Sequence, residues 1–531
     1  MKYIVLALIS ALLFSISWPT YGIPYFIFIA WVPLLMLEHE ITKFSSINHK
    51  SWAVFGCAYL AFVVWNAVTT GWLYEARNPD GSHAWFAVIF PVVVNALLMS
   101  LAFQLYHWYK KAKGTYWGLA FFIAIWMSFE KFHLAWEFTW PWLNLGNVFA
   151  EKPQLIQWYD TLGATGGSFW VLIVNVWAFY TLRIWEAGRK SKDLIKNMGI
   201  LIALMGVPIL ISLIKYQQFD EKPIGKVRVM MMQPDLNPYT EKYQKDSLQI
   251  VSELLELAQN DKTPQIEYYL APETAFPGYG GLSENGLKDS KQVQLVENFL
   301  QAHPKSVFMG GVSTYQIRNR DQIEVEAYNS AIQIEPQGRY QVYHKGKLVP
   351  GVEIFPYIKV LKPLLGDAML NFGGTISSLG QSEERVVFSN PFNQGKIAPI
   401  ICYESVYGEF VTDYVKKGAN FLGIVTNDSW WGISQGHRQL LAYARLRAIE
   451  NRREIARAAN SGISAHIDAK GNILEDTFYG DRTVLVSDIQ LYNGTTFYTR
   501  AGDLLSRICI FALGFLVCYL FVEKIRGKSV F

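Results

Sequence analysis

The stretch KIAPIICYES, residues 396–405, is a short apolar run that ends abruptly in Cys402, Tyr403 and Glu404. A run of this length with polar residues at its end is typical of a buried β-strand. A cysteine at the exit of such a strand is either an ordinary small hydrophobic side chain or a nucleophile, because active sites of α/β domains gather at the carboxyl ends of strands. The rest of the chain has to decide between these interpretations.

Similar apolar runs recur between residues 223 and 495, and amphipathic helical patterns lie between some of them. The helical patterns cover residues 241–259 and 437–454, where apolar side chains recur at the helical period. Strands that alternate with amphipathic helices predict layered sheets covered by helices, so this part of the chain is predicted to be an α/β domain. The other strand-like runs are KVRVMMMQ, IEYYLAP, SVFMGGVS, NSAIQIEP, GRYQVYHK, FLGIVTN and SGISAHIDA.

Two further polar residues stand at strand ends, as Cys402 does. Glu273 follows the run IEYYLAP, and Lys345 closes the run GRYQVYHK, with Lys347 two residues on as a competitor for its role. Taken singly, each has an ordinary explanation as a loop acid, a solvated lysine or a buried structural cysteine. Taken together, a carboxylate base, a cation and a thiol are the parts of a nucleophilic cysteine site, in which the cation also stabilises an oxyanion.

The composition indicates a membrane protein with a soluble part. Of the 531 residues, 51% are hydrophobic and 17% are charged, whereas about 25% charged residues are ordinary for a soluble domain. The net charge of +4 is small and spread along the chain, which gives no reason to expect nucleic acid as a partner.

Cysteine usage argues against a disulfide framework. Cys402 is alone in the polar part of the chain, whereas Cys57, Cys509 and Cys518 lie in very apolar surroundings. The sequence contains no C-x-x-C pair or clustered His/Cys pattern, so no metal site is predicted.

Apolar runs long enough to cross a bilayer, about 17–25 residues each, predict about eight membrane helices. The first run follows Lys2 as a signal peptide would, but no small-x-small cleavage site comes after it, so it is predicted to remain as a helix. Seven helices are thus predicted in residues 1–222, the α/β domain in 223–495, and the eighth helix with a tail in 496–531. The runs lie near residues 3–20, 22–38, 53–75, 84–107, 115–134, 166–184, 198–215 and 503–522.

Positively charged residues alternate between the connections of these helices. The only Lys or Arg residues in the first, third and fifth connections are Arg77 and Lys152, whereas cytoplasmic connections are rich in Lys and Arg. Both termini are therefore predicted to be cytoplasmic, and residues 223–495 are predicted to lie on the far side of the membrane, which is the periplasm in a diderm bacterium. The charges of the predicted cytoplasmic segments are Lys43, Lys50, Lys110, Lys111, Lys113, Arg183, Arg189, Lys190, Lys192, Lys196, Lys524, Arg526 and Lys528.

Several blocks of the sequence resemble bacterial apolipoprotein N-acyltransferases, a membrane-embedded branch of the nitrilase superfamily. The order Glu, Lys, Cys at strand ends is the catalytic signature of that superfamily, and the likeness extends over nearly the whole chain. The resemblance implies a bundle of about eight transmembrane helices joined to an extracytoplasmic α/β domain of the nitrilase type, an αββα sandwich. The blocks are PETAFP, KGKLVPGVE, CYES, TNDSWWG, ARLRAIENRREIARAANSGISAHIDAKGNI, WPWLNLGN (140–147) and GATGGSFWV (163–171).

The resemblance also implies roles for individual residues. Glu273 matches the general base, Lys345 the oxyanion-stabilising cation and Cys402 the nucleophile. Glu353 matches a second glutamate that supports the site, although many members read LVPFGE where this chain reads LVPGVE, which puts the role of Glu353 in question. Further matches are the residues after the nucleophile and an aromatic near the mouth of the site, namely Tyr403, Glu404 and Trp430 or its neighbour Trp431.

The activity that the resemblance implies is a two-step acyl transfer. An acyl chain passes from a phospholipid, with phosphatidylethanolamine expected, to Cys402 as a thioester. It then passes to the α-amine of the diacylglyceryl-modified cysteine that begins an apolipoprotein. The expected partners are these two substrates and the bilayer of the bacterial inner membrane. No metal or organic cofactor is required, and a monomer is expected because one chain carries the complete site.

Two other functions compete with this interpretation. A membrane-tethered amidase or nitrile hydrolase would use the same three residues with water as the acceptor, but a tether needs only one helix. A transporter or scaffold would place its soluble domain in a binding role, but the apolar runs contain few of the ionisable groups that mark ion or proton paths. A non-catalytic relative would also be free to lose the three residues, and all three are present.

Overall fold

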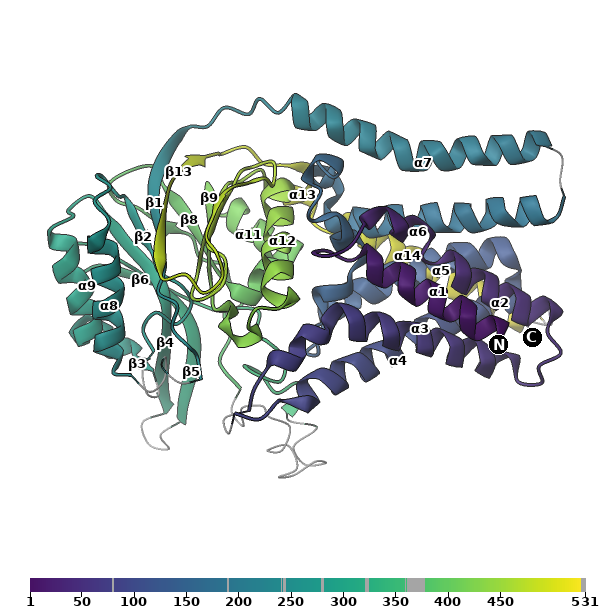
Figure 1. The fold of residues 1–531 in the computed structure, drawn as a ribbon, viewed down its shortest axis with the longest axis horizontal. Coiled ribbons are helices and arrows are strands. Elements are labelled where there is room, and N and C mark those ends of the chain that lie inside the picture. Colours follow the sequence, from purple (N-terminus) through teal and green to yellow (C-terminus); the bar gives the residue numbers. More distant parts are fainter. Residues whose placement is uncertain are drawn as a thin grey trace. The chain divides into compact units, whose positions relative to one another are not determined.

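The structure is a computed structural model that describes residues 1–78, 81–188, 191–239, 241, 245–277, 281–319, 324–358, 360 and 378–526 (Figure 1). Its contacts divide the chain into two compact units. The helical unit comprises residues 1–72, 85–218 and 501–531, and the α/β unit comprises residues 73–84 and 219–500. Arg189, Lys190 and Lys528, which were used to predict the orientation in the membrane, lie outside the described residues.

The helical unit contains a helix at each of the predicted apolar runs. Among the described residues, six helical stretches are long and apolar enough to cross a membrane: Pro24–Phe44, Lys50–Glu75, Trp85–Lys113, Tyr159–Glu186, Ser191–Gln217 and Leu504–Glu523. Of the other two predicted runs, the first forms the shorter apolar helix α1, and the fifth forms α5, whose last turn carries Glu130 and Lys131. The helices are α1 (Lys2–Ser17), η1 (Pro24–Ile29), α2 (Val32–Phe44), α3 (Lys50–Thr70), η2 (Gly71–Glu75), α4 (Trp85–Lys113), α5 (Thr115–His133), η3 (Pro141–Leu143), η4 (Leu145–Phe149), η5 (Pro153–Leu155), α6 (Tyr159–Glu186), α7 (Ser191–Gln217) and α14 (Leu504–Ile525).

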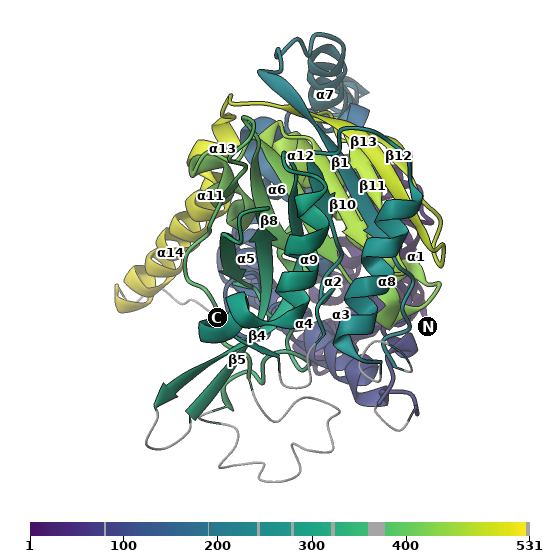
Figure 2. The same cartoon turned by 90° about the vertical axis from the view of Figure 1, so that its left-hand side faces the viewer.

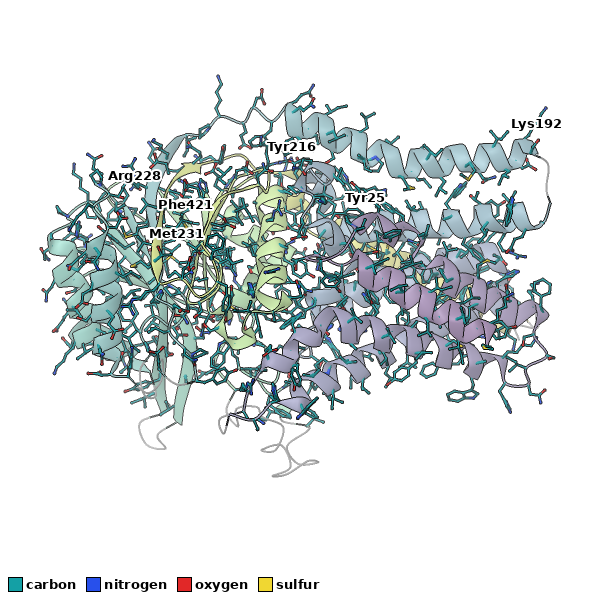
Figure 3. All side chains as sticks on the ribbon, in the orientation of Figure 1. Tyr25, Lys192, Tyr216, Arg228, Met231 and Phe421 are labelled. Carbon is teal, nitrogen blue, oxygen red and sulfur yellow. The ribbon has the colours of Figure 1, made fainter. Side chains whose placement is uncertain are left out.

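Helix α7 exposes the kind of apolar surface that is typical of a membrane-spanning helix. Lys192 and Tyr216 mark its two ends in Figure 3. Between them, large apolar side chains such as Ile202 and Leu210 are 65% and 58% exposed. Apolar surface of this extent is unfavourable in water but suits a helix surrounded by acyl chains, in which all backbone hydrogen bonds are satisfied internally.

Two buried carboxylates stabilise the interior of the helical unit. Glu38 on α2 accepts hydrogen bonds from Lys110 and from His107 Nδ1, the latter at 2.9 Å, both on α4. Glu130 on α5 accepts a hydrogen bond from the Ser168 hydroxyl of α6 at 2.5 Å. A charge in an apolar interior is tolerated only when it is paired or hydrogen-bonded, so these contacts fix the neighbouring helices relative to one another.

The α/β unit consists of two sheets that pack face to face. The first has the strand order β13-β1-β2-β4-β5-β6, with β3 paired to β4, and the second has the order β12-β11-β10-β9-β8-β7. Figures 1 and 2 show α8 and α9 on the outer face of the first sheet and α11 and α12 on that of the second. The predicted fold class, a membrane helical bundle with an αββα nitrilase-like domain, is confirmed.

The bounds of the elements in the α/β unit are β1 (Gly225–Gln233), α8 (Ser247–Asn260), β2 (Tyr268–Leu270), β3 (Leu282–Ser283), η6 (Glu284–Asp289), α9 (Lys291–Gln301), β4 (Val307–Asn319), β5 (Glu324–Ile334), β6 (Tyr340–His344), β7 (Phe388–Ser389), β8 (Lys396–Ile401), η8 (Cys402–Val406), α11 (Gly408–Lys416), β9 (Phe421–Thr426), η9 (Asp428–Trp431), α12 (Gln435–Asn451), β10 (Ile455–Ala459), β11 (Ala465–Ile467), β12 (Ile473–Asp476), β13 (Thr483–Leu491) and α13 (Phe497–Ala501).

Local sequence explains where the outer helices begin and end. The predicted helix at 241–259 begins later, at Ser247, because the Asp246 side chain caps it by accepting a hydrogen bond from the Leu248 N–H at 3.1 Å. The predicted helix at 437–454 ends earlier, at Asn451, where Arg452 takes a left-handed conformation with φ +50°. The apolar faces of α8 and α9 pack onto β1, β2, β4 and β5.

Aromatic packing between the two sheets fills the centre of the sandwich. Tyr268 on β2 and Phe421 on β9 are fully buried and meet edge to face, with ring centroids 5.2 Å apart. In Figure 3, Met231 and Phe421 mark this interior. Such aromatic pairs contribute roughly 0.5–1.5 kcal/mol beyond the burial of their area.

The position of Phe421 predicts a large effect on stability. Phe421→Ala should lower the free energy of unfolding of the α/β unit by about 3–5 kcal/mol, because it removes buried area and leaves a cavity between the sheets. Phe478→Ala is the matched control, because the Phe478 side chain is 80% exposed and its loss should cost less than about 0.5 kcal/mol. Thermal and denaturant unfolding of the purified protein in detergent measures both, and equal effects would contradict the interior assignment.

Candidate active site

The ends of three strands, two from the first sheet and one from the second, bring the predicted residues into one region of the α/β unit. Glu273 follows β2 after two further residues, Lys345 directly follows β6, and Cys402 directly follows β8. β2 belongs to the parallel part of the first sheet and β8 to the parallel part of the second. In α/β folds, such carboxyl strand ends are where active sites are built.

The Lys345 ammonium group is the centre of the site. Its Nζ lies 3.0 Å from Glu273 Oε1 and 2.9 Å from Glu353 Oε1, and the residue is 1% exposed. Asn329 on β5 completes the group, because its Nδ2 donates to the same oxygen of each carboxylate at 2.8 Å. One cation and one neutral amide thus hold two carboxylates together in a buried site.

These carboxylates keep Lys345 charged. Burial by itself lowers the pKa of a lysine, but the charges of Glu273 and Glu353 outweigh burial and hold the pKa of Lys345 well above its ordinary value. Lys345 therefore supplies a permanent positive charge at neutral pH. A fixed cation of this kind stabilises negative charge that develops on a reacting oxygen.

Glu353 reaches Lys345 despite the unusual LVPGVE loop. The backbone N–H of Glu353 donates to the Val349 carbonyl at 2.9 Å, and the Val349 N–H donates to Glu353 Oε2 at 2.8 Å. This tight turn keeps the carboxylate directed at Lys345. The sequence difference from many family members therefore leaves the contact between Glu353 and Lys345 in place.

The backbone fixes Glu273 closely. Its Oε2 accepts a hydrogen bond from the Asn427 N–H, just beyond β9, at 3.1 Å. Thr274, the next residue, has φ +55°, a conformation that non-glycine residues seldom adopt. Gly311 on β4 packs against this segment so tightly that a Cβ there would lie 2.3 Å from the Thr274 nitrogen and 2.6 Å from the Glu273 Cα.

Cys402 occupies a sharp turn between a strand and a short helix. It has φ +47°, lies at the start of η8 and is 6% exposed. Its carbonyl oxygen accepts a hydrogen bond from the Ser405 hydroxyl at 2.7 Å. A left-handed residue costs of order 1–3 kcal/mol and persists only where its surroundings enforce it, which is common at active sites.

The surroundings of Cys402 disfavour its thiolate form. Burial, and then the negative charge of Glu273, raise the pKa of the thiol above its ordinary value, against the opposing influences of Lys345 and of a hydrogen bond with Thr426. The nucleophilic thiolate therefore forms only when a base removes the proton. Glu273 is the carboxylate whose charge acts most strongly on the Cys402 thiol.

Glu404 joins the segment of Lys345 to the segment of Cys402. It is fully buried, and its Oε1 accepts hydrogen bonds from the Gly346 N–H and the Tyr343 hydroxyl, each at 2.6 Å. Its Oε2 accepts one from the Ile401 N–H at 2.8 Å. Burial raises the pKa of Glu404, although these donors oppose the shift. Glu404 therefore connects Gly346, the neighbour of Lys345, to Ile401, the neighbour of Cys402.

The predicted aromatic residues lie near the same strand ends. Tyr403 is buried directly after Cys402, and its ring meets that of Tyr407 edge to face at 5.2 Å. Trp430 and Trp431 are half-buried in η9. The Trp430 ring meets the Tyr239 ring edge to face at 5.2 Å.

Sequence reasoning missed the residues that orient the others. Asn329 was visible as a polar side chain inside the strand-like run NSAIQIEP, and that interruption was its only signal. Asn427 acts through its backbone N–H, which no side-chain pattern reveals. Within the described residues, no group of three or more His, Cys, Asp or Glu side chains is arranged to hold a metal ion.

Comparison with known proteins identifies the family. Residues 10–177 match the model of the apolipoprotein N-acyltransferase N-terminal domain, and residues 226–497 match that of the carbon-nitrogen hydrolase. The apolipoprotein N-acyltransferase of Chlorobaculum tepidum is 31% identical over 98% of this chain and 96% of that protein. The chain belongs to the apolipoprotein N-acyltransferase family.

Other members of the family and the nitrilase superfamily are also similar. Apolipoprotein N-acyltransferase 1 of Treponema denticola is 26% identical over 99% of this chain and 97% of that protein. Among solved structures, Saccharomyces cerevisiae Nit3, a member of branch 10 of the nitrilase superfamily, matches 50% of this chain and 91% of its own, with 15% identity and a TM-score of 0.37. Membership of the family makes this protein a bacterial membrane acyltransferase.

The packing at Gly311 predicts a selective loss of activity. Gly311→Ala should reduce acyltransferase activity at least tenfold, because the new methyl group must displace the backbone that carries Glu273, and an overpacked site costs roughly 1–3 kcal/mol. Gly286→Ala is the control, because a Cβ there has its nearest neighbour at 3.9 Å. Activity and melting temperature are measured together, and a fully active Gly311→Ala protein would contradict this geometry.

Proposed function

We propose that this protein transfers an acyl chain from a phospholipid to the N-terminal amine of diacylglyceryl-modified apolipoproteins through a thioester on Cys402. The observation that carries the proposal is the buried Lys345 between Glu273 and Glu353, which also acts electrostatically on the Cys402 thiol. Family membership supplies the class of reaction. The geometry supports the assignment of Glu273 as base, Lys345 as oxyanion stabiliser and Cys402 as nucleophile.

The first step forms the thioester. Glu273 takes the proton of Cys402, and the sulfur attacks the ester carbonyl carbon of the phospholipid. Lys345 and the backbone N–H of Tyr403 stabilise the resulting oxyanion. The carbon–oxygen ester bond then breaks, and the lysophospholipid leaves with the proton that Glu273 had taken.

The second step passes the acyl chain to the acceptor, so the reaction is of the ping-pong type. The free α-amine of the lipoprotein precursor attacks the thioester carbonyl, and Glu273 accepts the amine proton. The carbon–sulfur bond breaks, and Cys402 recovers a proton from Glu273. A thioester suits this order of events because it stays reactive enough to acylate an amine.

The membrane architecture supports lipid substrates. Both substrates carry acyl chains, and removing a chain from the bilayer costs about 0.8 kcal/mol per CH₂. A catalytic domain joined to membrane helices meets such substrates where they reside. We infer that the active form is a monomer, because one chain carries every residue assigned to the reaction. We also propose phosphatidylethanolamine as the donor.

We also propose an orientation. The distribution of Lys and Arg along the sequence supports seven helices within residues 1–222, a periplasmic catalytic domain at 223–495, and an eighth helix with a cytoplasmic tail at 496–531. Both termini are then cytoplasmic, and the protein resides in the inner membrane.

The thioester predicts a covalent adduct. After incubation with phosphatidylethanolamine, the intact mass of the purified protein should increase by one acyl chain, and hydroxylamine should remove the addition. Cys402→Ala and Cys402→Ser should lack this hydroxylamine-labile adduct. Cys57→Ser is the matched control and should retain it. Absence of the adduct from the wild type would remove the thioester from the mechanism, and rapid release of free fatty acid would favour the hydrolase alternative.

The orientation predicts which positions an impermeant reagent reaches. In a background with Cys57, Cys509 and Cys518 changed to Ser, Lys305→Cys and Lys192→Cys each introduce a cysteine at an exposed position. A membrane-impermeant maleimide applied to cells with a permeabilised outer membrane should label the first variant, and it should label the second only after lysis. The reverse pattern would invert the orientation.

A further inference from the structure

A threonine next to the nucleophile has no role in the mechanism as described so far. Strands β8 and β9 are parallel neighbours, with Ile401 paired to Val425. Cys402 directly follows β8 and Thr426 is the last residue of β9, so the register brings these two residues to neighbouring strand ends. A hydrogen bond with Thr426 is one of the influences that lower the pKa of the Cys402 thiol, and Thr426 is completely buried.

Thr426 is itself held by a buried ion pair. Its hydroxyl donates to Asp428 Oδ1 at 2.8 Å, and Asp428 Oδ2 accepts from Arg457 Nη2, on β10, also at 2.8 Å. Asp428 and Arg457 are completely buried. Gly462 packs against the pair so closely that a Cβ there would lie 2.0 Å from Asp428 Oδ2. The contacts therefore run in one chain from Arg457 through Asp428 and Thr426 to Cys402.

The proton of the threonine hydroxyl determines what Thr426 does. A hydroxyl has one proton to donate and lone pairs to accept with, whereas an ionised carboxylate only accepts. While the hydroxyl donates to Asp428, its oxygen accepts the hydrogen bond of the Cys402 thiol. Once the thiol has given its proton to Glu273, the sulfur becomes an acceptor, and the hydroxyl turns to donate to it. Arg457 continues to compensate the charge of Asp428 during that exchange.

We propose that Thr426 is a positioning residue that orients the Cys402 sulfur and stabilises its thiolate. Its hydroxyl does so by switching the hydrogen bond that it donates from Asp428 to the sulfur. This inference rests on the proposed role of Cys402 as nucleophile. Thr426 keeps its own proton throughout, and the proton of the thiol goes to Glu273.

The charges around Cys402 leave a role for a neutral donor. Among the groups that influence its pKa, Glu273 and Asp428 disfavour the thiolate, and Lys345 favours it. Lys345 is already hydrogen-bonded to both Glu273 and Glu353. A hydroxyl on the neighbouring strand gives the thiolate a hydrogen bond without adding a further charge to a buried site.

Alkylation of Cys402 tests the proposal without relying on acyl transfer. Thr426→Val removes the hydroxyl and keeps the branched shape, and Thr426→Ser keeps the hydroxyl. The rate at which iodoacetamide modifies Cys402 is followed by peptide mass spectrometry across neutral and mildly alkaline pH. We expect Thr426→Val to be modified at least about tenfold more slowly at each pH, since hydrogen bonds to charged groups contribute about 1.5–3 kcal/mol, and Thr426→Ser to stay close to the wild type.

The outcomes separate the hydroxyl from simple packing. A Thr426→Val protein alkylated at the wild-type rate would overturn the proposal, and so would equal slowing in Thr426→Val and Thr426→Ser, which would indicate a packing effect. Melting temperatures identify misfolded variants. If Thr426→Val does not fold, Thr426→Ala, which also lacks the hydroxyl, is judged by the same criterion. Failure of the proposed function itself is a different result, namely the lack of an acyl adduct on the wild type.

Discussion

The contact between the Lys345 ammonium group and two buried carboxylates is the interaction on which the rest of the site depends. Lys345 lies within 3.0 Å of Glu273 and 2.9 Å of Glu353 while being 1% exposed. Leaving any one of these charges without a partner in the interior would cost about 3–5 kcal/mol. The two carboxylates stabilise the buried cation and keep it charged, and in the proposed mechanism the same cation stabilises the oxyanion, so stability and catalysis would share one set of contacts.

Hydrogen bonds with the backbone connect this arrangement to Cys402, the proposed nucleophile. Glu404 holds the N–H groups of Gly346 and Ile401, which are the neighbours of Lys345 and Cys402 in the chain. The end of β9 holds the other side, because the Asn427 N–H donates to Glu273 and Thr426 closes the strand that pairs with β8, which Cys402 follows. Movement of Glu273, Lys345 or Cys402 relative to the others therefore requires buried hydrogen bonds to break, and such rigidity is what the proposed mechanism needs to preorganise charges for a transition state.

The sequence was sufficient to predict an α/β domain and the placement of Glu273, Lys345 and Cys402 at strand ends, because buried strands have a strong apolar pattern and their polar exits stand out. The αββα sandwich itself was implied by the family resemblance. Asn329 was missed because its role depends on the pairing of β5 with β6, where its carbonyl accepts the Lys345 N–H at 2.8 Å. Glu353 was questioned because its loop differs from the family pattern, but the turn geometry of residues 349–353 is a property of the folded backbone and cannot be derived from residue identities alone.

The most direct test of the central claim follows one acyl chain through the site. The protein is loaded from phosphatidylethanolamine with a deuterated acyl chain, freed of excess lipid, and mixed with a peptide that begins with diacylglyceryl-cysteine. Rapid quenching and mass spectrometry then follow the label on the Cys402 peptide and on the peptide amine. We predict that the label leaves Cys402 at the rate at which it arrives on the amine. Arrival on the amine without prior labelling of Cys402, or loss from Cys402 only as free fatty acid, would contradict the account.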